Sequence, residues 1–134
     1  MATITLTRTG DRPLTFEGDQ IASANSRWAK GQESNRWHEL CLYETTTNKF
    51  VLHIAYRTQW QGELNRDEAL ILSDIADVAM ELRAYDPGAG TATGPVGLGY
   101  EQFHQKQMKR LDDLRARYES AVSELLADMP ERLE

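Results

Sequence analysis

The chain has only one cysteine, Cys41, so no disulfide can form within it. A chain without disulfides suits a reducing compartment, and we expect a cytoplasmic protein. Long hydrophobic runs are also missing: the longest, such as LCLY and ALIL, are far shorter than the roughly twenty apolar residues that cross a bilayer. The first residues, MATITLTRTGDRP, have the pattern of neither a signal peptide nor a transit peptide. The sequence therefore predicts no membrane span and no targeting segment.

Strong catalytic and cofactor motifs are missing as well. The three histidines, His38, His53 and His104, do not have the spacing of metal ligands, and paired cysteines do not occur. The glycine-rich stretch 86–99 lacks the Gly-Lys-Ser/Thr of a phosphate-binding loop and the spacing of a dinucleotide fingerprint. We therefore expect no metal and no other cofactor, and the sequence does not define a reaction.

Excess positive charge is absent too, because the 134 residues carry a net charge of −6. Residues 1–60 contain seven Lys/Arg and six Asp/Glu, whereas residues 61–134 contain eight and fifteen. An acidic chain is repelled by phosphate backbones unless its basic residues share one face. The one basic patch, Lys106, Lys109 and Arg110, is followed at once by acidic residues, so charge argues against a nucleic-acid partner.

Apolar and polar residues alternate in the first 72 residues, as expected of strands half buried in a sheet. TITLT and LTF are two short candidate strands, and QIASANS is a weaker third. Gly10-Asp11 and Gly18-Asp19 supply turn chemistry. We expect short antiparallel strands in this part of the chain.

The clearest pattern is a β-hairpin in residues 36–60, where two apolar runs flank the polar TTTN. A three-residue turn ending in Asn48, with Asn48 in the left-handed conformation, sets the register. Cys41 then faces His53 on one side of the ribbon. The other side gathers the apolar residues: Leu40, Leu42, Phe50, Leu52, Ile54 and Tyr56. A slip of one residue would mix the two sets, so we favour this register.

Residues 67–85 allow two interpretations. As one helix, they would begin with a capping box of Asn65 and Glu68. As a strand followed by a helix, EALIL is a further strand and Ser73 caps a helix that starts at Asp74. We favour the second interpretation, because four apolar residues in succession would cover every side of a helix.

Residues 86–99 contain five glycines and two prolines without any apolar period, which predicts a loop. Residues 100–129 carry one narrow apolar stripe at helical spacing: Leu111, Leu114, Tyr118, Ala121 or Val122, and Leu125. A helix of about 28 residues would be roughly 42 Å long, more than the breadth of a small domain. It either overhangs and meets a partner, which includes a second copy of the chain, or lies across the sheet and frays at its ends.

These elements predict a single α+β domain over residues 1–134. An antiparallel β-meander of four to six strands, mainly in residues 1–72, is expected to be covered on one face by two C-terminal helices. The first helix is expected at 74–85, the glycine and proline loop at 86–99, and the long last helix at 100–129.

Two kinds of site can be drawn from these patterns. Cys41, His53 and Glu39 share one face of the hairpin and contain the groups of a cysteine nucleophile, although mid-strand positions favour a structural cysteine packed under the helices. Aromatic, arginine and glutamine residues at strand ends have the composition of a protein interface, although tryptophans also close the ends of cores. This interaction set consists of Trp28, Trp37, Tyr56, Arg57, Gln59, Trp60 and Gln61.

The leading hypothesis is a small acidic, non-catalytic module that binds another protein as its regulator or inhibitor. Such an inhibitor could present carboxylates to the nucleic-acid-binding surface of a basic protein. A homodimer through the long helix is a further expectation. The first alternative is a small enzyme or ligand-binding protein that uses Cys41, His53 and Glu39 beneath the 86–99 loop. The second alternative is a nucleic-acid-binding accessory protein that uses the basic patch.

Overall fold

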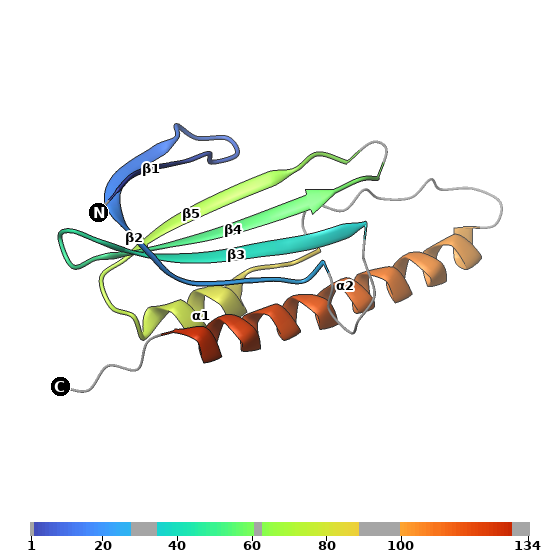
Figure 1. Ribbon diagram of the computed structural model, residues 1–134. Helices are drawn as coiled ribbons and strands as arrows, with labels where there is room; N and C mark the ends of the chain where they lie inside the picture. The colour runs from blue at the N-terminus through green and yellow to red at the C-terminus, as the bar shows by residue number, and fades with distance from the viewer. Residues whose placement is uncertain (1, 28–34, 61–62, 89–99, 130–134) are drawn as a thin grey trace.

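The computed structural model describes residues 2–27, 35–60, 63–88 and 100–129, with side chains in the last segment from residue 108 onward. Five antiparallel strands follow one another in the sheet in the order β1-β2-β3-β4-β5, and two helices come after them (Figure 1). The elements are β1 (Ala2–Leu6), β2 (Leu14–Asn25), β3 (Arg36–Thr45), β4 (Phe50–Thr58), β5 (Arg66–Leu72), α1 (Asp77–Ala84) and α2 (Tyr100–Asp128). The predicted α+β meander with a long last helix is confirmed.

The central hairpin has the predicted register. Cys41 pairs with His53 and Leu40 pairs with Ile54 across β3 and β4. Asn48 has a φ of 62°, the left-handed conformation expected at the end of the turn. The backbone N–H of Lys49 donates to the Thr45 hydroxyl oxygen at 3.1 Å, which closes the turn on itself. Local chemistry therefore fixes which residues of this hairpin share a face.

The second strand differs from the prediction, because LTF and QIASANS form one continuous strand. Gly18 is not in a turn: it lies inside β2, where a Cβ atom would collide with the carbonyl oxygen of Glu44. The β2–β3 register then shifts between Gln20 and Ala22. Such an irregularity bends a strand, and Figure 1 shows β2 turning sharply where it leaves β3.

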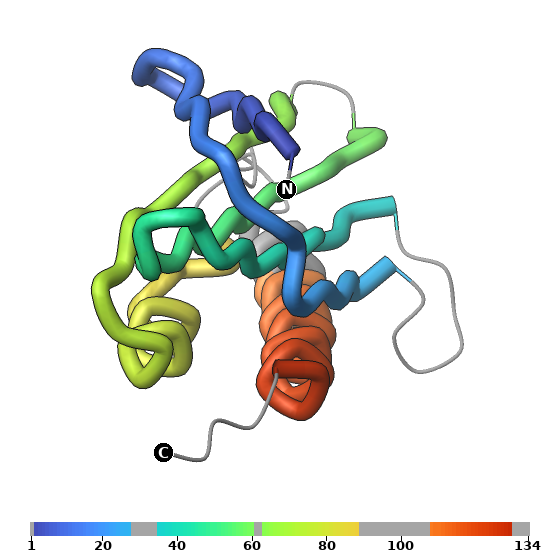
Figure 2. The backbone as a smooth tube through the Cα atoms, turned by 60° about the vertical axis from the view of Figure 1, so that its left-hand side comes forward, coloured from blue at the N-terminus to red at the C-terminus, as the bar shows by residue number. Residues whose placement is uncertain are grey.

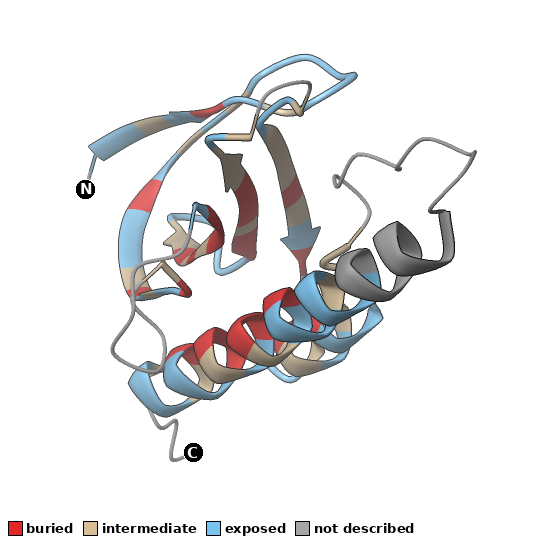
Figure 3. Cartoon of the chain, turned by 90° about the vertical axis from the view of Figure 1, so that its right-hand side faces the viewer, coloured by how far each residue is buried: buried red, intermediate tan, exposed pale blue. Residues whose placement is uncertain are grey.

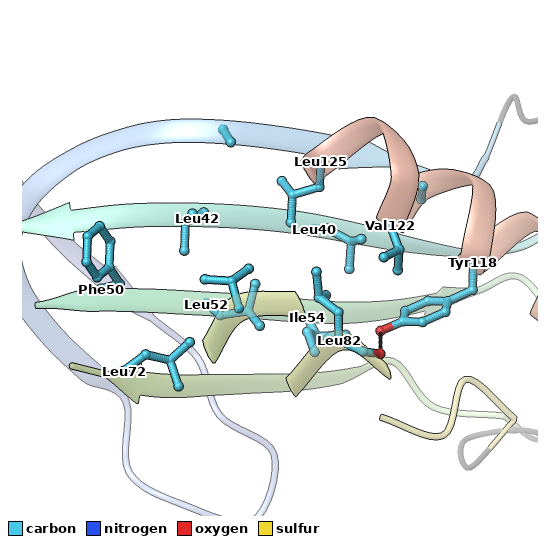
Figure 4. Close-up of a cluster of buried hydrophobic side chains, with 13 residues drawn as sticks. Leu40, Leu42, Phe50, Leu52, Ile54, Leu72, Leu82, Tyr118, Val122 and Leu125 are labelled. Atoms are coloured by element: carbon cyan, nitrogen blue, oxygen red, sulfur yellow. Dashed lines mark hydrogen bonds between the residues drawn. The ribbon is translucent and has the colours of Figure 1, made fainter. Parts of the chain in front are cut away.

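The main core lies between the sheet and the helices. It is formed by alternate residues of β3 and β4 together with inward residues of α1 and α2 (Figure 4). These include Leu40, Leu42, Leu52, Ile54, Val78, Leu82, Tyr118, Ala121, Val122 and Leu125. Figure 3 shows the buried residues of α2 along the side that faces the sheet. The predicted apolar stripe of α2 is therefore used within the chain.

A second, smaller core lies on the reverse face of the sheet. Residues 2–18, called here the N-terminal hairpin, fold over this face on the side opposite the helices (Figure 2). Leu6 of the hairpin packs with Tyr43, Val51 and Ala69, and Cys41 lies against the same group. The expectation that Cys41 packs under the helices was wrong, because the register turns its side chain to the other face.

The segment after β4 is a strand and then a helix, as favoured from the sequence. The helix starts later than expected, at Asp77 instead of Asp74, and Ser73 does not cap it. The Asp74 carboxylate instead accepts a hydrogen bond from the N–H of Ala76 at 3.0 Å, within a turn that precedes α1. Within the part of the chain that the structure describes, neither helix has an apolar stretch that could cross a membrane.

Candidate functional site at the Trp60 end of the sheet

The three candidate catalytic residues lie on one face, and no hydrogen bond joins one of them to another among the described residues. His53 Nε2 lies 3.0 Å from Asp67 Oδ1, so the imidazole is engaged by a carboxylate of β5. Burial raises the pKa of the Cys41 thiol, which keeps it protonated at neutral pH and weakly nucleophilic. Glu39 instead accepts a hydrogen bond from Trp37 Nε1 at 3.1 Å. This geometry supports a packing role for Cys41.

Asp67 is the centre of this face, and the sequence patterns did not single it out. Arg57 donates to both of its carboxylate oxygens, at 2.7 and 3.2 Å. Burial alone would raise the pKa of Asp67, but hydrogen bonds from Arg57 and His53 outweigh it and lower the pKa. The backbone of Asp67 also pairs with Thr9, because the Thr9 N–H donates to the Asp67 carbonyl at 2.8 Å. Asp67 therefore fastens the tip of the N-terminal hairpin to the edge of the sheet.

Two members of the predicted interaction set belong to the interior. Tyr56 is only 1 % exposed, and its hydroxyl donates to Glu63 Oε1 at 2.7 Å. Trp37 is 8 % exposed, with the guanidinium of Arg27 over its ring at 4.4 Å. For these two residues, closing the core is the role that the structure shows. Of the remaining members, Arg57 is half-buried and Gln59 exposed, whereas Trp28 and Gln61 lie outside the described residues.

A buried network of polar side chains lies next to the end of β4. The Glu63 carboxylate accepts hydrogen bonds from Tyr56 and from the Thr58 hydroxyl, the latter at 2.9 Å, and it forms a two-pronged ion pair with Arg36. The Arg36 and Glu63 side chains are only 5 % and 1 % exposed. If the Arg36 guanidinium moved away, the buried Glu63 carboxylate would be left without a compensating charge, which is energetically costly. The ion pair therefore holds Arg36 in one position.

Trp60 stands at the centre of an open site next to this network. The Arg36 guanidinium lies 3.6 Å from the centroid of the Trp60 ring, and the Arg110 guanidinium lies 4.8 Å from it. A cavity of about 220 Å³ opens beside the ring, called here the Trp60 notch. It is lined by Asn35, Arg36, Trp60, Lys109, Arg110, Asp113 and Leu114.

The Trp60 notch contains residues from two sites that were predicted separately from the sequence. Trp60 belongs to the predicted interaction set, and Lys109 and Arg110 belong to the predicted basic patch; the side chain of Lys106 lies outside the described residues. The buried indole N–H of Trp60 has no hydrogen-bond acceptor among the described residues. The connection that follows Trp60 also carries Leu64, whose side chain is 81 % exposed.

The chain matches no protein family model, and neither a curated protein nor a solved structure matches it. Within residues 2–27, 35–60, 63–88 and 108–129, no group of three or more His, Cys, Asp or Glu is arranged to hold a metal ion. Among the described side chains, those of the Trp60 notch have the composition of a binding site.

Proposed function

We propose that the chain is a small, non-catalytic module that binds another protein through the Trp60 notch and acts as its regulator or inhibitor. The observation that carries this proposal is the placement of the Trp60 ring beneath two guanidinium groups at the wall of an open cavity. Tryptophan and arginine are the residue types that most often dominate the energy of protein interfaces.

The Trp60 notch is also organised before any partner arrives. Arg36 is held by its buried ion pair with Glu63, and the ring of Trp60 rests against Arg36. The backbone N–H of Trp60 donates to the Thr58 hydroxyl oxygen at 3.0 Å, which fixes the chain as it leaves β4. A site that is already rigid loses little conformational entropy on binding, so more of the contact energy appears as affinity.

The charges of the notch indicate what it would bind. Lys109 and Arg110 are exposed on its rim, while the carboxylate of Asp113 is paired with Arg117 at 2.8 Å. The rim of the notch is thus positively charged, although the chain as a whole has a net charge of −6. We propose that the partner presents a carboxylate to this rim together with an apolar side chain for Leu64, which is exposed in the connection after Trp60.

The other hypotheses have less support in the geometry. Stacking of a nucleotide base needs a free aromatic face, and guanidinium groups already lie over the Trp60 ring. A homodimer through the stripe of α2 would need residues such as Leu114 and Leu125 that are buried against the chain's own sheet. Catalysis by Cys41 would need a thiolate, which burial disfavours.

We keep a reducing, cytoplasmic location as part of the proposal because the single cysteine has no partner for a disulfide.

Site-specific photo-crosslinking tests this proposal in the native host. A photoreactive amino acid at Gln59, exposed beside the notch, is expected to capture one protein that is identified by mass spectrometry. The matched control carries the same group at Thr46, exposed in the turn at the other end of the hairpin. Capture of the same proteins from both positions, or of nucleic acid from Gln59, would contradict the proposal.

A further inference from the structure

A second cavity lies between the two helices and shares no lining residue with the Trp60 notch. Its volume is about 460 Å³, within the range of small-molecule sites. It is lined by Leu82, Arg83, Tyr85, Pro87, Arg115, Tyr118, Glu119, Val122, Ser123 and Leu126, and is called here the interhelical groove. None of these residues takes part in the proposed binding of a protein, so this groove needs its own explanation.

The two ends of the interhelical groove differ in chemistry. The Tyr118 hydroxyl donates to the Leu82 carbonyl at 2.6 Å, which brings the last turn of α1, including Arg83, to the level of Tyr118 (Figure 4). Arg115 lies one turn before Tyr118 on α2, so both arginines belong to the same end. Leu126 lies eleven residues after Arg115, which corresponds to about 16 Å along the helix. The groove therefore runs from a cationic end, past Val122, to an apolar end.

The cations at this end are available to a ligand. Arg83 is exposed and makes no ion pair within the described part of the chain. Among the described residues, the one ion pair of Arg115 is a 4.0 Å contact with Asp112, and both of those side chains are exposed to solvent. Glu119 is the one acidic residue in the lining, so the groove has an excess of positive charge.

The volume and chemistry of the groove indicate one kind of occupant. A volume of about 460 Å³ is that of a small-molecule site, whereas a stable protein interface buries roughly 800 Å² on each partner. A ligand with one anionic head and one hydrocarbon chain matches the cationic end and the apolar end of the groove at the same time.

We propose that the interhelical groove binds a monomeric, single-chain amphiphile, with its carboxylate head at Arg83 and Arg115 and its hydrocarbon chain along Val122 and Leu126. Arginine guanidinium groups suit carboxylates because they donate parallel, charge-assisted hydrogen bonds. Tyr85 and Tyr118 line the groove and also contact the buried His38 ring, with ring centroids 5.7 and 5.0 Å away. Occupation of the groove would therefore change the NMR signals of His38 without touching it.

Titration of the full chain with decanoate tests this inference. We expect saturable binding, seen by calorimetry and as shifts of the His38 ring signals, whereas decanol binds more weakly and decyltrimethylammonium does not bind. Arg83→Glu and Arg115→Glu should each lower decanoate affinity by about tenfold or more, because each removes a charge-assisted contact. Arg12→Glu, the same charge change at the exposed tip of the N-terminal hairpin, should leave affinity unchanged.

Filling the groove gives a second test that does not depend on charge. Ser123 is exposed and lines the groove, so Ser123→Trp is expected to block decanoate while leaving the core and the circular dichroism spectrum unchanged. Equal binding of all three amphiphiles would show mere hydrophobic adsorption and would overturn the inference. Unchanged decanoate affinity in a folded Ser123→Trp variant would overturn it as well. Neither result bears on the Trp60 notch.

Discussion

The phenol of Tyr118 on α2 donates a 2.6 Å hydrogen bond to the backbone carbonyl of Leu82 on α1. Both residues are buried, so this bond satisfies a helix-end carbonyl that water does not reach. It fastens the short first helix to the long second one and sets the inner wall of the interhelical groove.

Tyr118→Phe keeps the ring and removes only this hydrogen bond. Because a buried carbonyl loses its donor, we expect the free energy of unfolding to fall by about 1–3 kcal/mol in urea titrations. Thr5→Val is the matched control, since it also removes one hydroxyl, but from an exposed pair with Thr15. The control should change stability by no more than about 0.5 kcal/mol. Equal effects of the two substitutions would show that the helix-to-helix bond contributes nothing.

The buried His38 makes stability depend on pH. Burial lowers its pKa from 6.5 to about 4, an effect that the nearby carbonyl of Pro87 offsets only in part. Between these two values the unfolded chain binds a proton that the folded chain does not. The contribution of neutral His38 to stability is therefore complete above about pH 6.5 and is lost as the pH falls toward 4.

This linkage predicts a loss of about 2 kcal/mol of unfolding free energy between pH 7 and pH 5. His38→Phe retains an aromatic ring among Tyr56, Tyr85 and Tyr118 but cannot be protonated, so its stability should change much less over that interval. Urea titrations of both proteins at the two pH values measure the difference. An equally steep decline in His38→Phe would assign the acid sensitivity to other groups.

The reactivity of Cys41 distinguishes a packed thiol from an activated one. Because burial raises its pKa, the native thiol should react with Ellman's reagent at pH 8 about tenfold or more slowly than the thiol of the urea-unfolded chain. Cys41→Ala is the blank for this assay. A native rate that equals or exceeds the unfolded rate would restore the hypothesis of a cysteine nucleophile.

Gly18 tests the close approach of β2 to β3. Gly18→Ala places a methyl group against the Glu44 carbonyl, so the two strands must separate locally, and we expect a loss of about 1–3 kcal/mol in thermal or urea unfolding. Asp19→Ala, at the next position, which is exposed, is the control and should have little effect. Equal stability of Gly18→Ala and the wild-type chain would mean that the strands are not held this close together.

The sequence alone defines those features that depend on neighbouring residues. Alternation of apolar residues in β3 and β4, together with Asn48 at the turn, was enough to place Cys41 opposite His53. The apolar spacing of α2 likewise identified the apolar residues that it buries, although Leu111 is only half-buried and the buried Arg117 was not part of the predicted stripe. In these elements the period of the pattern and the geometry of the backbone agree, so each local preference supports the same fold.

Features that depend on distant contacts were missed. Gly18 carries the local signature of a turn, but its lack of a side chain serves a contact with β3 that no local pattern reveals. Asp67 and Glu63 accept hydrogen bonds from side chains of β4. These bonds depend on how β5 and the preceding connection pack against β4, which no local sequence pattern predicts. Arg110 reaches Trp60 across 50 positions of the sequence, so the Trp60 notch could not be recognised from either segment alone.

The affinity for the protein captured beside the Trp60 notch tests the proposed function most directly. By isothermal titration calorimetry with the folded variants, Trp60→Ala should weaken binding by about thirtyfold or more, the effect typical of a residue that dominates an interface. Arg110→Glu should also weaken binding, because it reverses a charge on the rim, whereas Lys49→Glu in the distant hairpin turn should bind like the wild-type chain. If Trp60→Ala and Arg110→Glu both bind as tightly as the wild-type chain, the notch is not the binding site.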